Sequence, residues 1–167
     1  DHDVPIAGKR IGIVGTGSTA IQIVTAVVDQ VAELRLFQRT PQWIAPAPNP
    51  AYSEDEKATF RQTPAAMEAI RAEVSRAFTD GFANVLSDAD SPVLLGLHDM
   101  CVAHLERSVR DPVLREQLRP SYRAGCKRLV ISDRFYEAIQ RPNATLVTEG
   151  IERVEPAGVR TRDGVPH

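Results

Sequence analysis

Residues 9–20 read KRIGIVGTGSTA, and this stretch decides the fold of the 167-residue chain. Its first half is a short apolar run that ends at Gly15, which is typical of a buried parallel strand. Apolar residues then recur at helical spacing, at Ile21, Val24, Val27, Val28 and Val31. Residues 34–37 (LRLF) have the pattern of a second strand. A strand, a glycine turn, a helix and a strand predict a βαβ unit with a right-handed crossover.

The glycine turn has the G-x-G-x-x-A spacing of the dinucleotide-binding fingerprint. Gly15 permits the tight turn, Gly17 lets a pyrophosphate approach the backbone, and Ala20 lets the helix pack on the strand. The start of the helix offers free N–H groups to an anion. Hydroxyl groups that can add hydrogen bonds belong to Thr16, Ser18 and Thr19. A turn that holds no ligand is the alternative, but the flanking strand and helix favour nucleotide binding.

The residues at the end of the second strand distinguish an NAD site from an NADP site. An NAD site usually has Asp or Glu there for the ribose hydroxyls, whereas this chain has Gln38-Arg39-Thr40. Arg39 can hold a 2′-phosphate bidentately and stack on adenine, and Thr40 can donate a further hydrogen bond. A solvated surface arginine is the alternative. The position of Arg39, 24 residues after Gly15, favours NADP.

The middle of the chain predicts helices. Prolines between residues 41 and 53 imply an extended, ordered loop, and Ser53-x-x-Glu56 is a capping box that opens a helix. Proline residues 64, 92 and 112 then indicate a kink or restart and two further helix starts. An apolar stripe is expected at Phe60, Met67, Ile70, Val74 and Phe78.

Strand patterns return near the C-terminus. Residues 129–131 form a short apolar run, and Ser132-Asp133 can cap a helix over residues 134–140. Residues 144–147 predict a third parallel strand. Residues 151–161, which turn around Pro156-Ala157-Gly158, predict a β-hairpin.

The predicted fold class is therefore α/β: a Rossmann-like parallel sheet flanked by helices, with a helical insert and a C-terminal β-hairpin. We expect one NADP-binding domain over residues 1–167. Its Rossmann-like core takes about residues 8–40 and 120–167, and its helical insert takes about residues 54–118.

Composition excludes several classes of protein. Hydrophobic residues are 43% and charged residues 25%, as in an ordinary globular protein. A net charge of -2 gives no general attraction to nucleic acid or membrane, and no apolar run is long enough to span a bilayer. The two cysteines lack a CxxC pairing, which favours a reducing, cytoplasmic location. His98-x-x-Cys101-x-x-His104 lacks a fourth ligand, so no metal is expected.

Two stretches together resemble the class B flavoprotein monooxygenases, specifically the Baeyer–Villiger monooxygenases. The first runs from Gly8 through the glycine turn to Gln22 and continues with F-Q-R-T-P-Q-W at residues 37–43. The second is G-C-K-R-L at residues 125–129, followed by S-D-R-F-Y at 132–136 and R-P-N-A-T-L-V at 141–147. The F-Q-R-T-P and G-x-K-R segments are far more specific than the glycine turn.

The resemblance implies roles for particular residues. Arg39, Thr40 and Lys127 would hold the 2′-phosphate of NADPH, and Gln22 joins the cofactor-binding residues. Arg128 would be the active-site arginine that stabilises negative charge on the oxygenated flavin and on the ketone adduct. From residue type alone, Arg128 would be a surface salt bridge.

The family inserts an NADPH domain into an FAD domain. NADPH reduces the flavin, which then reacts with O₂ and inserts one oxygen atom beside a ketone carbonyl, giving an ester or lactone. The implied partners are a small-molecule ketone, O₂ and the FAD domain of the same polypeptide. The FAD glycine fingerprint and the F-x-G-x-x-x-H signature are missing from these residues. We therefore expect an NADP-binding domain excised from a longer enzyme, with FAD bound in the full-length enzyme only and no activity alone.

Two other functions stay open. An N- or S-oxygenating flavin-containing monooxygenase shares this NADP-domain design. A free-standing NADP-binding module would bind the cofactor without chemistry. A disulfide reductase is disfavoured because the chain has no CxxC or CxxxxC pair. The family often has proline after the tyrosine that precedes the G-x-K-R segment, whereas Arg123 follows Tyr122 here.

Overall fold

The computed structural model describes residues 4–48, 50–88 and 90–167. The chain forms two compact units, which we call the core unit (residues up to Ala47 and from Met100 onward) and the insert unit (Pro48–Asp99). The insert was expected to extend to residue 118. Residues 100–118 instead group with the core unit, because Cys101, Leu105 and Val109 are buried among its apolar side chains.

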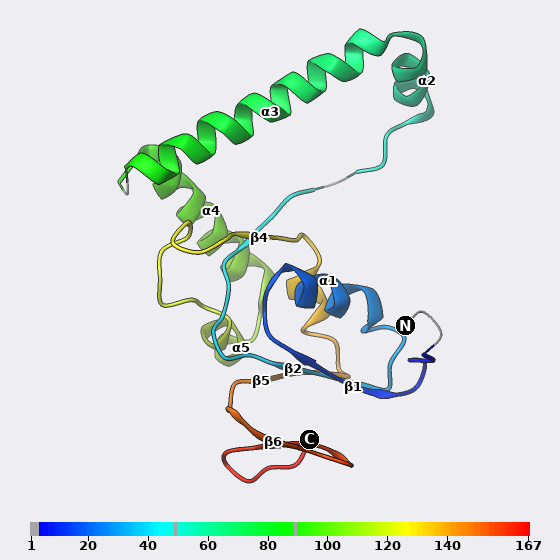
Figure 1. The fold of residues 1–167 in the computed structure, drawn as a ribbon, viewed down its shortest axis with the longest axis vertical. Helices are drawn as coiled ribbons and strands as arrows, with labels where there is room; N and C mark the ends of the chain where they lie inside the picture. Colours follow the sequence, from blue (N-terminus) through cyan, green and yellow to red (C-terminus); the bar gives the residue numbers. More distant parts are fainter. Residues whose placement is uncertain (1–3, 49, 89) are drawn as a thin grey trace. The chain divides into compact units, whose positions relative to one another are not determined.

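The core unit is built on a parallel sheet (Figure 1). Its strands β1 (Arg10–Val14), β2 (Glu33–Phe37) and β5 (Ala144–Val147) lie in the order β1-β2-β5. Val14 is opposite Phe37, and Phe37 is opposite Val147, so the three carboxyl ends meet at one edge. The predicted third parallel strand is confirmed, and residues that follow the strands gather at this edge.

One face of the sheet is covered by helices. Helix α1 (Ser18–Val27) buries Ile21 and Val24 and packs against β1 and the short helix α6 (Phe135–Ala138). The hydroxyl of Ser132 accepts hydrogen bonds from the backbone N–H groups that begin α6, at 3.4 and 3.2 Å. The helix expected over residues 134–140 ends at Ala138 and is only one turn long.

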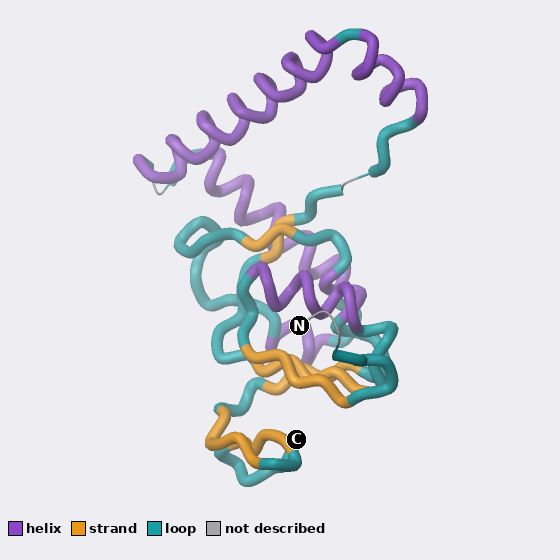
Figure 2. The backbone as a smooth tube through the Cα atoms, turned by 45° about the vertical axis from the view of Figure 1, so that its right-hand side comes forward, coloured by secondary structure: helices purple, strands orange, loops and turns teal. Residues whose placement is uncertain are grey.

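The opposite face of the sheet carries the C-terminal hairpin, as Figures 1 and 2 show. Strands β6 (Ile151–Glu155) and β7 (Gly158–Thr161) pair antiparallel, which confirms the predicted hairpin. Beyond the hairpin, the backbone of His167 exchanges hydrogen bonds of 2.7 and 2.9 Å with Val159. Arg35 and Phe37 contact the His167 ring from the sheet. Alternate residues of β2 therefore serve the hairpin and the helical layer.

A second, small parallel sheet was not predicted. Strand β3 (Ile44–Ala45) lies within the proline-rich loop and pairs with β4 (Val130–Ile131). It is too short to produce a sequence pattern of its own. Because β3 follows the end of β2 and β4 follows the G-x-K-R segment, the pairing holds these two segments side by side.

The remaining elements are helices. In the insert unit, α2 (Glu54–Gln62) is followed directly by α3 (Pro64–Ser87). Helix α4 (Pro92–Ser108) crosses the boundary between the units, and α5 (Pro112–Gln117) lies in the core unit. The predicted capping box is confirmed: Ser53 N–H donates to the Glu56 carboxylate at 2.7 Å, and Glu56 N–H donates to the Ser53 hydroxyl at 3.2 Å.

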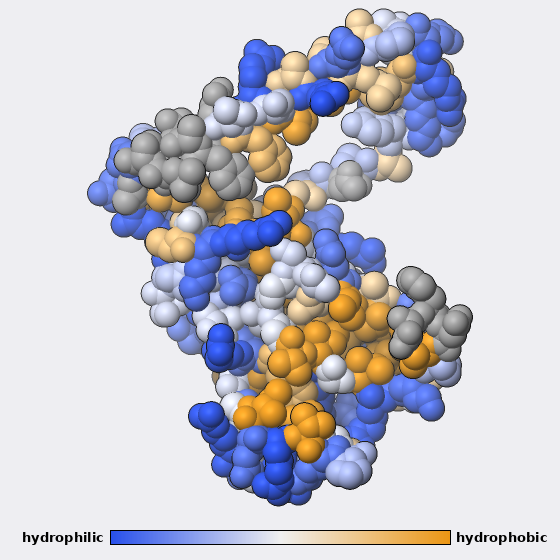
Figure 3. Space-filling view, viewed as in Figure 1, coloured by the Kyte–Doolittle hydropathy of each residue, from blue (hydrophilic) through white to orange (hydrophobic). Residues whose placement is uncertain are grey.

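The expected apolar stripe on α3 is exposed. Met67, Val74 and Phe78 are each more than half exposed, and Figure 3 shows apolar side chains along this helix. The stripe is therefore not part of a core within the described residues. None of the helices in the described segments is long and apolar enough to cross a membrane.

Candidate cofactor-binding site

A cavity of about 750 Å³ opens at the carboxyl edge of the sheet, within the core unit. It is lined by the glycine turn, the end of β2, Lys127, the connection from β5 to β6, and the residue after β7. Three cations and one carboxylate contribute to the lining, so it favours an anion. The lining residues are Val14, Gly15, Thr16, Gly17, Phe37, Gln38, Arg39, Thr40, Gln42, Lys127, Thr148, Glu149, Gly150, Ile151 and Arg162.

The glycine turn has the geometry of an anion-binding turn. Gly15 adopts a φ of +102°, which disfavours any other residue, and its N–H donates to Phe37 O at 2.9 Å. Gly17 is the N-cap of α1, and a Cβ atom added there would meet nothing within 4 Å. No side chain caps the helix, and its first turn holds no acid. Its N–H groups therefore fit a pyrophosphate.

The other predicted residues of the turn have different surroundings. Thr16 is buried, and its hydroxyl donates a 2.6 Å hydrogen bond to the carbonyl of Thr40. It thus ties the glycine turn to the end of β2. Ala20 is buried on the packing face of α1, as its predicted role requires. The predicted residues that do not line the cavity are Ser18, Thr19, Ala20 and Gln22.

Arg39 and Lys127 line the same cavity although they are far apart in sequence. Gln38 precedes Arg39; it is buried, and its side-chain amide donates to Gln117 O at 2.7 Å. This bond fixes the backbone at the end of β2. Arg39 itself is exposed at the cavity, where a ligand can reach it.

Tyr122 joins the two cationic segments. Its carbonyl accepts a 2.5 Å hydrogen bond from the indole N–H of Trp43, and its hydroxyl lies 2.8 Å from Gln42 Oε1. Burial raises the pKa of Tyr122 above its ordinary value of 10.0, so the hydroxyl stays protonated and can donate. The ammonium group of Lys127 lies 4.5 Å from the centre of the Tyr122 ring, a cation–π contact. The contacts of Tyr122 therefore explain how Arg39 and Lys127 come to line one cavity.

Arg128 does not line this cavity. Its side chain is exposed, and within the described segments no carboxylate forms an ion pair with it. Among the described residues, the surface salt bridge that residue type suggests is therefore not formed.

The His98-x-x-Cys101-x-x-His104 spacing does not produce a ligand cluster. Cys101 is fully buried, and burial raises the pKa of its thiol to about 11. Among residues 4–48, 50–88 and 90–167, no group of three or more His, Cys, Asp or Glu side chains has a metal-binding arrangement.

Outside the segments that the sequence singled out, the lining contains three polar residues that sequence reasoning missed: Thr148, Glu149 and Arg162. The first two follow β5, so the strand order could have indicated them. Arg162 follows the hairpin, and its place depends on how the hairpin folds back on the sheet. No local pattern in the sequence carries that information.

The fold is that of a Rossmann-like α/β domain, and its glycine turn has a geometry that suits an anion. No protein-family model matches the chain. It is 37% identical to a Baeyer-Villiger monooxygenase of Pseudomonas aeruginosa, over 98% of this chain and 31% of that enzyme. It is 44% identical to an uncharacterised monooxygenase of Mycobacterium tuberculosis, over 100% of this chain and 33% of the relative.

Solved structures agree with this similarity. The complex of OTEMO with FAD and NADP matches 99% of this chain and 38% of its own, at 26% identity and a TM-score of 0.74. A cyclohexanone monooxygenase mutant from Rhodococcus bound to NADP+ matches 100% of this chain and 38% of its own, with a TM-score of 0.79; at 23% identity it shows the fold alone.

The resemblance to Baeyer–Villiger monooxygenases that the sequence predicted is confirmed. The chain spans about a third of the length of the curated relatives it matches. It therefore corresponds to one segment of such an enzyme.

Proposed function

We propose that this chain is the NADPH-binding domain of a flavin-dependent Baeyer–Villiger monooxygenase. The observation that carries the proposal is the shared cavity of the glycine turn, Arg39 and Lys127. A pyrophosphate fits the uncapped start of α1, and the two cations fit a 2′-phosphate. Similarity to an NADP complex over 99% of the chain supports the same assignment.

The residues divide the work of holding the cofactor. The N–H groups after Gly17 would bind the pyrophosphate, and the absence of a Cβ atom leaves room for its oxygens. Arg39 would bind the 2′-phosphate through its planar guanidinium, with Lys127 as a second cation. Thr16 would tie the glycine turn to the end of β2, and Tyr122 would support Lys127. Bound NADPH would supply the electrons that reduce the flavin of the whole enzyme.

Arg128 would serve the oxygenation step in the whole enzyme. Its exposed guanidinium has no carboxylate partner in the described segments, so it is available for an external anion. There it would stabilise negative charge as oxygen is inserted beside the carbonyl of a ketone, to give an ester or lactone. FAD, O₂ and the ketone are the partners that this activity requires.

The named relatives favour this function over N- or S-oxygenation. Two of them, from Pseudomonas aeruginosa and Streptomyces coelicolor, are Baeyer-Villiger monooxygenases at 37% and 35% identity. A non-catalytic NADP-binding module would present the same cavity, and turnover assays of the whole protein with FAD distinguish it.

Calorimetric titration with NADPH and NADH tests the cofactor assignment. Arg39→Ala should weaken NADPH binding by about 1.5–3 kcal/mol, the value of a charge-assisted hydrogen bond, and leave NADH little changed. Gly17→Ala should weaken both cofactors, because its methyl group occupies the space meant for the pyrophosphate. Equal losses for both cofactors in Arg39→Ala would contradict the assignment to NADP.

A further inference from the structure

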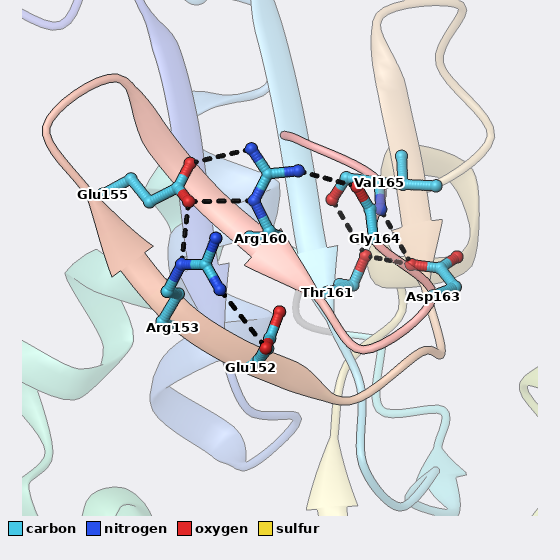
Figure 4. Close-up of polar contacts among 8 residues, drawn as sticks. All are labelled: Glu152, Arg153, Glu155, Arg160, Thr161, Asp163, Gly164 and Val165. Atoms are coloured by element: carbon cyan, nitrogen blue, oxygen red, sulfur yellow. Dashed lines mark hydrogen bonds and ion pairs between the residues drawn. The ribbon is translucent and has the colours of Figure 1, made fainter.

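Arg162 is the cation of the cavity that no sequence motif indicated. It follows β7 in a turn that Thr161 closes: Thr161 N–H donates to Val165 O at 3.1 Å, and its hydroxyl donates to the Asp163 carboxylate at 2.6 Å (Figure 4). Thr161 is fully buried. The N–H of Arg162 itself donates to Gly150 O at 2.8 Å. The backbone of Arg162 is therefore fixed to both the turn and the start of β6.

The arginines of the hairpin differ in what they contact. Arg153 and Arg160 both donate to the Glu155 carboxylate, at 2.9 and 2.8 Å, as Figure 4 shows. In the described part of the chain, Arg162 has no such ion pair, although Asp163 is its neighbour. The guanidinium of Arg162 is therefore free to meet a ligand.

Gly150 determines where this guanidinium lies. A Cβ atom added at Gly150 would be 3.3 Å from Cδ, 3.4 Å from Nε and 3.6 Å from Cζ of Arg162. The Arg162 side chain thus runs close over the bare backbone of Gly150, and both residues line the cavity. A planar guanidinium held in this way presents a flat surface, on which an aromatic ring can stack.

The strand order indicates which part of a bound dinucleotide would lie against the Arg162 guanidinium. The pyrophosphate belongs at the glycine turn after β1, and the ribose belongs at the end of β2. Since β5 follows β2 in the sheet, the adenine continues from the ribose toward the carboxyl end of β5. Gly150 lies there, in the connection that follows β5, and Arg162 is bonded to its carbonyl and lines the same cavity.

We infer that Arg162 is a cofactor-binding residue whose guanidinium stacks on the adenine ring. The inference rests on the proposed function, because it requires an adenine dinucleotide in the cavity. It assigns Arg162 a different task from Arg39: Arg39 distinguishes NADPH from NADH, whereas Arg162 binds the part that both cofactors share.

Calorimetric titration of the 167-residue chain with NADPH and NADH at low ionic strength tests the inference. Arg162→Ala should weaken both cofactors by the same factor, about fivefold, as expected for a cation stacked on a ring. Arg162→Lys should recover only part of the NADPH affinity that Arg162→Ala loses, because lysine keeps the charge and loses the planar stack. Gly150→Ala should give a smaller loss by displacing the Arg162 side chain.

The matched control is Arg153→Ala on the same hairpin, which should bind NADPH like the unmodified chain. Full NADPH affinity in Arg162→Lys, or a loss confined to NADPH in Arg162→Ala, would overturn stacking. If Arg39→Ala loses NADPH affinity and Arg162→Ala does not, the inference fails and the proposed function stands. If the unmodified chain binds neither cofactor, both fail.

Discussion

The core unit and the insert unit use their apolar residues in opposite ways. In the core unit, Val24, Leu34 and Leu36 are fully buried, since the sheet has a helical layer on one face. In the insert unit, α2 buries no residue, and the stripe on α3 is exposed. Most helical stability in proteins comes from tertiary packing, so the insert helices depend on caps and local propensity. An amphipathic pattern predicts a helix, but it does not show what covers that helix.

The largest expected effect comes from substitutions that remove apolar volume from each unit. Leu36→Ala should lower the free energy of unfolding of the core unit by about 2–5 kcal/mol, because it leaves a cavity in the sheet. Val74→Ala on α3 should change stability by no more than about 0.5 kcal/mol. Urea unfolding followed by circular dichroism, with amide hydrogen exchange resolved by segment, measures both. Similar losses for the two variants would mean that the units are stabilised alike.

The second largest expected effect is that mild acid lowers the stability of the core unit but not that of the insert unit. His104 is buried in the core unit, and its burial, assisted by Arg107, lowers its pKa below the ordinary 6.5. As the pH falls below 6.5, the unfolded chain therefore binds the proton before the folded chain does. The stability of the core unit should be complete above pH 6.5 and fall below it, by up to about 1.4 kcal/mol per pH unit.

His104→Gln is the control for this pH dependence. It should abolish the fall in the free energy of unfolding below pH 6.5, whatever it does to stability at neutral pH. The insert unit has its own acid limit: the hydrogen bonds from Ser53 lower the pKa of Glu56 below 4.5, so the capping box should persist through this range. An unchanged slope in His104→Gln would assign the proton uptake to another group.

The smallest expected effect concerns the cap itself. Ser53→Ala removes the acceptor for the Glu56 N–H and should cost about 1 kcal/mol of local helix stability. Faster amide exchange should appear in residues 54–62 and leave β2 unchanged. Ser53→Asp, which retains a capping oxygen, should restore protection. A change that reached the sheet would show that the two units unfold together.

Local patterns account for what could be predicted. The glycine turn, the two flanking strands and the Ser53 capping box each lie within a few residues, and the structure confirms them. The shared position of Arg39 and Lys127 was also predicted, but through a family resemblance. No periodicity in the sequence joins these two segments.

What could not be predicted depends on distant pairing. Strand β3 exists because β4 lies beside it, and its two residues carry no pattern. Arg162 resembles any surface arginine until the hairpin places it over Gly150. Residues 100–118 were assigned to the insert because the sequence pattern predicts helices there but does not show which residues those helices pack against.

The link between Trp43 and Tyr122 has a practical consequence. Trp43 is the one tryptophan in the chain; it is buried, and its indole N–H is bonded to the residue whose ring supports Lys127. An anion that draws Lys127 away from Tyr122 would disturb the surroundings of that indole. We therefore expect the intrinsic fluorescence of Trp43 to change when such an anion binds.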